Sequence, residues 1–114
     1  KNMDDNDINQ IIKYIETNFA SATLKEAASR FGYHPDYLSR LIKKELGITF
    51  GNLKHRICIE QAKFLLVCTD LTVSQVAEQI GFSNMTFFYE LFSRYCGTTP
   101  ADYRNNIGQE RLQL

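Results

Sequence analysis

Thr23-Leu-Lys-Glu-Ala-Ala-Ser-Arg-Phe-Gly-Tyr33 decides the fold, because it returns 49 positions later as Thr72-Val-Ser-Gln-Val-Ala-Glu-Gln-Ile-Gly-Phe82. Each copy begins with Thr, has Glu or Gln three residues on, and ends in Gly followed by an aromatic residue. This spacing predicts a capping box, in which Glu26 returns the hydrogen bond of Thr23. The glycine can take a positive φ and end the helix. The sequence therefore contains two capped short helices, each followed at once by a second helix.

Apolar residues at helical spacing predict further helices around the two copies. Residues 7–19 form an amphipathic helix, with Asp7 as its expected cap. The helix that follows the second copy starts next to Ser83, another natural cap. A last helix starts at Pro100, where the missing N–H costs nothing, and runs to about Asn106.

From Thr49 to about Cys68, no proline and no glycine after Gly51 interrupts a helical pattern. This run predicts one helix roughly 27–30 Å long. We therefore predict an all-α fold of about seven helices, in which a long linker helix joins two helix-turn-helix subdomains. The expected divisions are a linker end at 1–6, a first subdomain at 7–48, the linker helix at 49–69, a second subdomain at 70–106 and a C-terminal tail at 107–114.

Composition bounds the function. The 114 residues hold 13 basic and 13 acidic side chains, a balance that counts against DNA binding. However, 8 of the basic residues lie between 21 and 70, against 5 acidic ones. Cys58, Cys68 and Cys96 have no paired spacing, which predicts reduced thiols, buried as small apolar residues, in a cytoplasmic protein. No apolar run approaches the ~18 residues of a membrane span. Because the chain begins at Lys1, we expect a fragment of a longer protein.

The second helix of a helix-turn-helix lies in the major groove. In the first subdomain its outward stripe is polar, and Arg40 is the best reader because its planar guanidinium can donate to O6 and N7 of guanine together. The predicted base-reading residues are Asp36, Ser39, Arg40, Met85, Thr86, Tyr89 and Glu90. The predicted phosphate-binding residues are Thr23, Lys43, Lys44, Arg56, Thr72, Ser83 and Asn84.

Simpler interpretations stand beside these. The repeat could be a structural duplication of a helical hairpin, and Arg40 with its neighbouring lysines could be an ordinary solvated face. Tyr37 and Tyr89 can be packing residues rather than base contacts, and Phe87, Phe88 and Phe92 are expected in the core. No catalytic constellation, phosphate loop or set of metal ligands at ligand spacing occurs in the sequence, so we expect neither an enzyme nor a cofactor.

Over residues 8–106, the chain resembles the DNA-binding domain of the AraC/XylS family of bacterial transcription regulators. The most specific matches are Ala62-Lys-Phe-Leu-Leu66, Val76-Ala77, Ile80-Gly-Phe-Ser83, Thr99-Pro100 and Tyr103-Arg104. The resemblance implies two helix-turn-helix subdomains, binding to double-stranded promoter DNA, and activation or repression through RNA polymerase. It also implies an upstream sensing or dimerisation domain that this chain lacks.

Three residues depart from the family, where basic side chains are common at the same places: Glu90, Ser93 and Cys58. We therefore expect the first subdomain to dominate the affinity for DNA. The alternative function is a protein-interaction module that docks on RNA polymerase or on a partner regulator.

Overall fold

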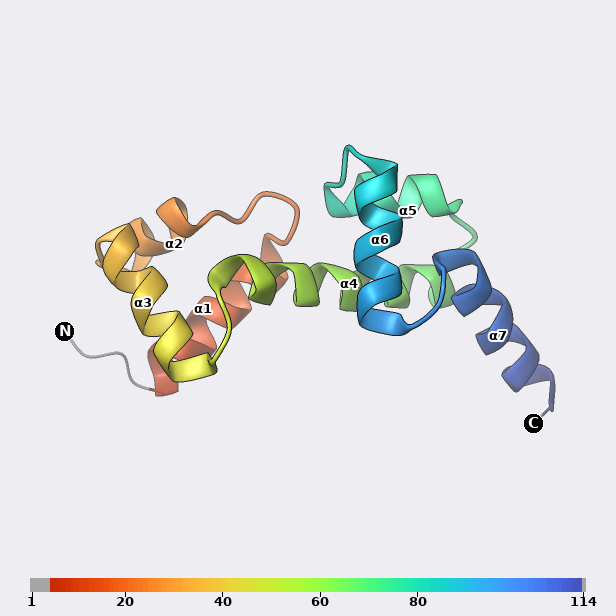
Figure 1. Cartoon of the computed structure of the whole chain (residues 1–114), viewed down its shortest axis with the longest axis horizontal. Helices are drawn as coiled ribbons and strands as arrows, with labels where there is room; N and C mark the ends of the chain where they lie inside the picture. The colour runs from red at the N-terminus through yellow and green to blue at the C-terminus, as the bar shows by residue number, and fades with distance from the viewer. Residues whose placement is uncertain (1–4, 114) are drawn as a thin grey trace. The chain divides into compact units, whose positions relative to one another are not determined.

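The computed structural model describes residues 5–113, with side chains for 7–107, and forms them into helices without a strand (Figure 1). The helices are α1 (Asp5–Thr17), α2 (Leu24–Phe31), α3 (Pro35–Leu46), α4 (Phe50–Cys68), α5 (Val73–Ile80), α6 (Met85–Cys96) and α7 (Pro100–Gln113). The predicted all-α fold with two helix-turn-helix subdomains and a long central helix is confirmed. Of the expected linker end, residues 1–4 lie outside the described part, whereas Asp5 and Asn6 belong to α1.

The chain divides into two compact units, residues 1–57 (the first unit) and 58–114 (the second unit). The boundary falls inside α4. The first half of α4 buries Phe50 and Leu53 in the core of the first unit. Its second half buries other side chains, among them Ile59, Ala62 and Leu66. Helix α4 is therefore a core element of each unit as well as the connection between them.

The core of the first unit is mainly aliphatic. Ile11 and Ile15 of α1 are buried together with Leu38 and Ile42 of α3, and none of them exposes more than 1% of its surface. Helix α2 packs against both α1 and α3. Its Ala27 and Ala28 are fully buried, and their small side chains allow the neighbouring helices to approach closely.

In the second unit, a series of contacting aromatic rings lies among the aliphatic core residues. The ring of Phe88 lies 5.2 Å from that of Phe82 and 5.9 Å from that of Phe92, centroid to centroid. Phe92 in turn meets Tyr103 of α7 edge-on at 5.7 Å. Tilted and edge-on pairs of this kind add stability beyond their buried area. Helix α6 is thereby held against α7 as well as against α5.

Two predicted caps are wrong. Helix α1 begins at Asp5, so Asp7 lies inside it, where its carboxylate accepts a 2.9 Å hydrogen bond from the Tyr33 hydroxyl. Helix α6 is capped by Asn84 and not by Ser83, since the Asn84 side chain accepts from the N–H of Phe87 at 3.0 Å. Asn and Ser have similar capping preferences, and here the helix starts one residue later than Ser83 requires.

Two burial predictions are also wrong. Phe87 is 39% exposed, although Phe88 and Phe92 are fully buried as expected. Cys68 is exposed at the end of α4, whereas Cys58 is buried and Cys96 is partly buried. Both errors concern residues in the first or last turn of a helix, where Phe87 packs against Phe82 with ring centroids 5.9 Å apart and still exposes part of its ring.

Helix α7 is longer than predicted, because it runs to Gln113 rather than to about Asn106. The extension contains Gln, Glu, Arg and Leu, all of which favour helix, and a single Gly costs only about 1 kcal/mol. The side chains of residues 108–114 lie outside the described part.

Candidate nucleic-acid interface

In each unit, the chain turns sharply between the two helices of the helix-turn-helix, which are α2 and α3 in the first unit and α5 and α6 in the second. Helix α2 ends at Gly32 (φ 76°) and α5 ends at Gly81 (φ 103°), both in the left-handed region that side chains disfavour. The next helix starts three to four residues later with its own cap. For α3 this cap is His34, whose Nδ1 accepts from the N–H of Asp36 at 3.2 Å. The turn therefore fixes where α3 and α6 begin.

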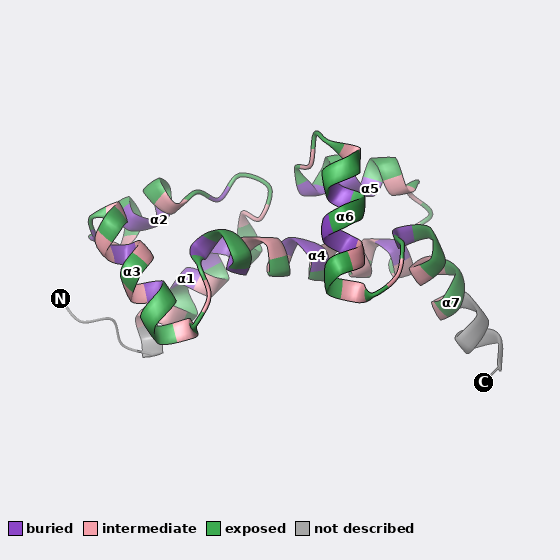
Figure 2. Cartoon of the chain, viewed as in Figure 1, coloured by how far each residue is buried: buried purple, intermediate pink, exposed green. Residues whose placement is uncertain are grey.

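Helix α3 presents the predicted reading residues on one side. Leu38 and Ile42 are buried on the opposite side, and this burial sets the rotation of the helix. Asp36 and Arg40 are exposed and Ser39 is partly exposed (Figure 2). The structure thus brings these three predicted readers together on a single solvent-facing stripe of the first unit.

Lys43 and Lys44 follow at the end of α3 and are both exposed. The Lys43 ammonium donates to the carbonyl oxygen of Gly47 at 3.2 Å. A cation at this end of a helix is stabilised by the helix dipole. The Lys43 ammonium is therefore already bonded to the end of its own helix, and Lys44 is the more available of the two lysines for a phosphate.

Helix α6 presents a different surface on the matching stripe. Thr86 and Glu90 are exposed, Met85 is partly exposed and Tyr89 is 38% exposed. The Tyr89 ring rests edge-on against the buried Phe88 ring, with centroids 6.2 Å apart. These four predicted readers also share one side of their helix, but none of them is cationic. The nearest cation on α6 is Arg94, in its last turn.

We call α2 and α5, the first helix of each helix-turn-helix, the bracing helices. Their first turns are capped in different ways. Thr72 and Gln75 form the complete predicted box, with bonds of 3.0 and 2.9 Å. In α2 the Thr23 hydroxyl accepts from the N–H of Glu26 at 3.1 Å, but the Glu26 carboxylate accepts from the Tyr14 hydroxyl at 3.1 Å and does not return to Thr23. The reciprocal bond predicted for Glu26 is therefore wrong.

Caps use some of the groups predicted to hold phosphates. The hydroxyls of Thr23 and Thr72 accept the N–H of the residue three positions on, so each keeps its O–H, beside the remaining N–H groups of its first turn, as a donor to an anion. Ser83, Asn84 and Arg56 are exposed. The Asn84 carbonyl oxygen is occupied by its cap bond, which leaves its amide NH₂ as the donor.

Two basic residues have positions that the sequence alone did not reveal. The Lys54 ammonium donates to the carbonyl oxygen of Ala22 at 2.6 Å, directly before α2. Arg104 donates to the carbonyl oxygens of Leu66 at 2.9 Å and Thr69 at 3.4 Å, before α5. Lys54 holds the segment that leads into α2, whereas Arg104 holds the last turn of α4 together with the segment that leads into α5. Their 50-residue separation, the same as that of Thr49 and Thr99, is the signal that could have identified them.

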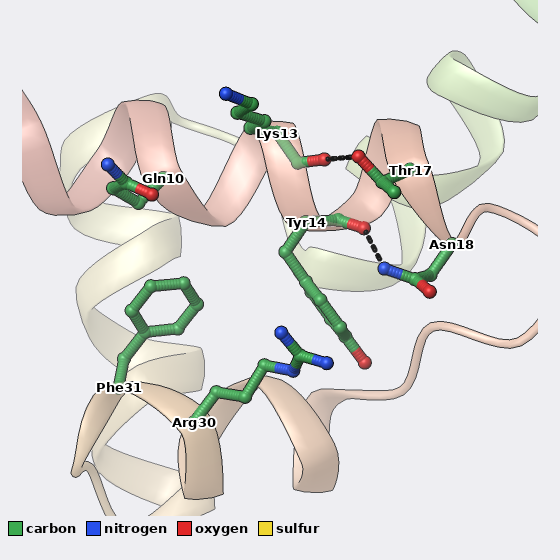
Figure 3. A pocket seen from close by; sticks show the side chains of 7 residues that line it. All are labelled: Gln10, Lys13, Tyr14, Thr17, Asn18, Arg30 and Phe31. Carbon is green, nitrogen blue, oxygen red and sulfur yellow. Dashed lines mark hydrogen bonds between the residues drawn. The ribbon is translucent and has the colours of Figure 1, made fainter.

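An open groove of about 310 Å³ lies between α1 and α2 of the first unit (Figure 3). The Arg30 guanidinium lies over the Tyr14 ring, 5.0 Å from its centroid, and Phe31 lies beside them. The Thr17 hydroxyl and the Asn18 amide donate to backbone carbonyls of α1. None of the lining residues belongs to α3, so the groove is separate from the predicted reading stripe.

The thiols do not form a redox pair. Burial raises the pKa of the Cys96 thiol, and the nearby Lys63 lowers it by a smaller amount. A raised pKa reduces the thiolate fraction and hence the reactivity. Cys58 is buried. These positions agree with a packing role for both residues. Among residues 5–113, no helix is long and apolar enough to cross a membrane.

Comparison with known proteins identifies relatives of the whole arrangement. A family model described as a helix-turn-helix domain matches residues 27–106. The uncharacterised HTH-type transcriptional regulator YtdP of Bacillus subtilis is 39% identical over 105 residues, which cover 91% of this chain and 13% of that protein. The chain thus spans about an eighth of the length of this relative.

Solved structures agree. The C-terminal domain of AraT, a response regulator from Geobacillus stearothermophilus, has 34% identity and a TM-score of 0.79, over 88% of this chain and 84% of that chain. The DNA-binding domain of AdpA, described as a global transcriptional factor and solved with a target DNA, has a TM-score of 0.83 over 93% of this chain and 96% of that chain. At 21% identity, this second likeness shows the fold alone.

Proposed function

The chain belongs to the AraC-type helix-turn-helix family, and from this premise we propose that it reads specific promoter sequences by placing α3 and α6 in two segments of the major groove of DNA. It is a DNA-binding domain of the kind found in helix-turn-helix transcriptional regulators. The observation that carries the proposal is the exposed stripe of α3, which offers Arg40 to solvent directly beyond a capped turn.

Arg40 is the guanine reader in this proposal, and Asp36 and Ser39 make shorter-range contacts beside it. A guanidinium donates two parallel hydrogen bonds to the guanine edge, which no other base presents in the same pattern. Lys44, Arg56 and the first-turn N–H groups of α2 and α5 bind phosphates, with Lys43, Ser83 and Asn84 in supporting contacts. Phosphate contacts position the domain without carrying sequence information.

The spacing of the site follows from α4. Its 19 residues correspond to roughly 28 Å of helix, and adjacent major-groove segments lie about 34 Å apart. In this proposal residues 7–48 and 70–106 are the two reading subdomains, and residues 49–69 connect them. We expect a DNA site of two sequence blocks whose centres lie about one helical turn apart.

The test is a selection of binding sites from random duplexes with this chain at low salt, followed by affinity measurements on the recovered site. Affinity is expected to fall steeply with salt, because each bound phosphate releases counterions. Arg40→Ala is expected to weaken binding by about 1–3 kcal/mol and to relax the base preference at one position.

Lys44→Ala is the matched control. It is expected to weaken binding to all sequences alike and to reduce the salt slope by about 1, without a change in base preference. If Arg40→Ala binds the recovered site as tightly and as selectively as the parent chain, Arg40 is not the reader.

Protein docking is the second candidate function, with RNA polymerase or a partner regulator as the partner. Phe64 favours it, because this large apolar side chain on α4 is 60% exposed, whereas large side chains of this kind are usually buried. Phe64→Ser is expected to leave the affinity for DNA unchanged and to lower transcription from a promoter carrying the selected site, measured with purified polymerase. Unchanged transcription would leave this candidate without support.

A further inference from the structure

The first half of α6 exposes a surface suited to a different base from the one that Arg40 suits. Guanine offers two acceptors in the major groove, N7 and O6, and a reader must bring two donors to both. In α6 the residue 50 positions after Arg40 is Glu90, whose carboxylate is an acceptor. Guanine facing Glu90 would therefore set acceptors against an acceptor. This position of α6 disfavours the base that α3 selects.

The neighbouring side chains are apolar or carry a methyl group. Met85 and Thr86 lie in the first turn of α6, and the exposed part of the Tyr89 ring lies one turn later. Thymine is the one base of DNA whose major-groove edge carries a methyl group, and apolar side chains recognise it by direct contact. The chemistry of this face therefore complements thymine.

Tyr89 is held in place before any DNA arrives. Its ring lies edge-on against Phe88, which is fully buried and in contact with Phe82 and Phe92. A side chain that is already ordered loses little conformational entropy when it binds. Ser39, the matching residue of α3, is too small to make such a contact.

We propose that α6 selects thymine through contact of the Tyr89 ring and the Thr86 methyl group with the thymine C5 methyl, whereas α3 selects guanine. This inference rests on the proposed function, since it names the base chemistry read by the second of the two reading helices. It makes Tyr89 and Thr86 specificity-determining residues.

Two parallel selections test it, one from random duplexes containing thymine and one from duplexes in which uracil replaces every thymine. Uracil lacks only the C5 methyl group. The block read by α3 is expected from both libraries, and the block read by α6 only from the thymine library. In the recovered site, a single uracil in the α6 block is expected to weaken binding about fourfold, the factor for losing contact with one methyl group.

Variants connect the effect to the residue. In Tyr89→Ala the uracil substitution should have no further effect, because the contact is already lost. Tyr89→Phe should keep the full preference for thymine, since the ring and not the hydroxyl makes the contact. Ser39→Ala, at the matching position of α3, should leave the fourfold effect intact.

The outcomes separate this inference from the function on which it rests. Recovery of both blocks from both libraries, or of one block alone from both, would overturn thymine selection by α6 while DNA binding stands. Loss of the thymine preference in Tyr89→Phe would assign it to the hydroxyl and overturn the methyl contact. If neither library yields an enriched sequence, the proposed function fails, and this inference fails with it.

Discussion

The two units of this chain are built on one frame and carry different chemistry. The frame residues recur at a separation of 49 positions up to the turn glycine and of 50 positions after it. Thr49 and Thr99 accept from the N–H three residues on at 3.1 Å in each case, and Lys54 and Arg104 both donate to carbonyls that precede a bracing helix. The solvent-facing residues of α3 do not recur in α6. Tyr89 and Glu90 stand in the second unit where the first has Ser39 and Arg40.

This difference teaches which positions a helix-turn-helix constrains. Caps, turn glycines and carbonyl-binding cations satisfy backbone groups whose positions the fold imposes, so residues with the same donors and acceptors return. The outward stripe satisfies few groups of the protein itself, the bond from Lys43 to the carbonyl oxygen of Gly47 being one such contact. It is free to follow the partner, and its charge changes from Asp36, Arg40 and Lys43 in α3 to Glu90 alone at the matching positions of α6.

The largest expected effect is in the two cores. Phe92→Ala should lower the free energy of unfolding by about 3–5 kcal/mol, because it removes a fully buried ring that contacts both Phe88 and Tyr103. Ile42→Ala, at the matching position of α3, should cost about 2–5 kcal/mol and less than Phe92→Ala, since it removes a smaller buried side chain. Urea unfolding of both variants measures the difference. A smaller loss in Phe92→Ala than in Ile42→Ala would contradict a large contribution from the ring contacts of Phe92.

Next in size are the two cations that bind carbonyls. Arg104→Met should cost about 1.5–3 kcal/mol, the usual contribution of a hydrogen bond from a charged group, because the carbonyls of Leu66 and Thr69 lose their donor. Lys54→Met should cost less, since one carbonyl, that of Ala22, loses its donor. Methionine keeps most of the apolar stem, so urea unfolding isolates the polar contact. Equal stability of Arg104→Met and the parent chain would show that these bonds do not hold α7.

The caps give a smaller contrast. Thr72→Ala and Thr23→Ala should each cost about 1 kcal/mol, because each removes the one side-chain acceptor that caps the first turn of its helix. The contrast lies in the partner residues, since Gln75 accepts from the backbone N–H of Thr72 whereas Glu26 accepts from the Tyr14 hydroxyl. Gln75→Ala should therefore weaken the cap of α5, and Glu26→Ala should weaken the contact between α1 and α2. Thermal unfolding of the four variants measures these losses, and an additive loss in the double variant of Tyr14→Phe with Glu26→Ala would contradict the contact assigned to Glu26.

The sequence predicted the parts of the fold that depend on the helical spacing of apolar residues and on the residues that start or end a helix. Thr23, Thr72 and Pro100 predicted the starts of α2, α5 and α7, and the uninterrupted run after Thr49 predicted α4. The misplaced caps at Asp7 and Ser83 have a common cause. In each case further residues of capping type lie close by in the sequence, so a local pattern leaves the first residue of the helix ambiguous.

The sequence could predict which helices carry the site residues, but not all the contacts that those residues make. The period of α3 predicted that Arg40 and Asp36 share its exposed side, and they do. The period could not predict that Lys43 would donate to Gly47 or that Phe87 would stay exposed, since both depend on what lies beyond a helix end. The roles of Lys54 and Arg104 depend on partners 32 and 38 residues away, and a local pattern carries no sign of them.

The smallest expected effect is a difference in alkaline stability. Burial, with a hydrogen bond to Glu26, raises the pKa of the Tyr14 hydroxyl above its ordinary value of 10.0. Burial likewise raises the pKa of the Cys96 thiol above 9.0. In both cases the folded state favours the protonated form. The contribution of each group to the free energy of unfolding is therefore fully present below its ordinary pKa, and it is lost as the pH rises through the raised pKa of the folded state. The second unit should therefore begin to lose stability near pH 9 and the first near pH 10.

Two variants resolve the contributions. In Cys96→Ala the loss that begins near pH 9 should disappear, and in Tyr14→Phe the loss above pH 10 should become shallower, although Tyr14→Phe starts from a lower stability because Glu26 loses its donor. Part of the alkaline loss should remain in both variants, because the hydrogen bond to Glu60 raises the pKa of Lys63, whose charged form the fold also favours. Urea midpoints measured between about pH 8 and 11 test this order. Identical pH profiles for Tyr14→Phe and the parent chain would show that the polar contact between α1 and α2 contributes nothing to the alkaline limit of the first unit.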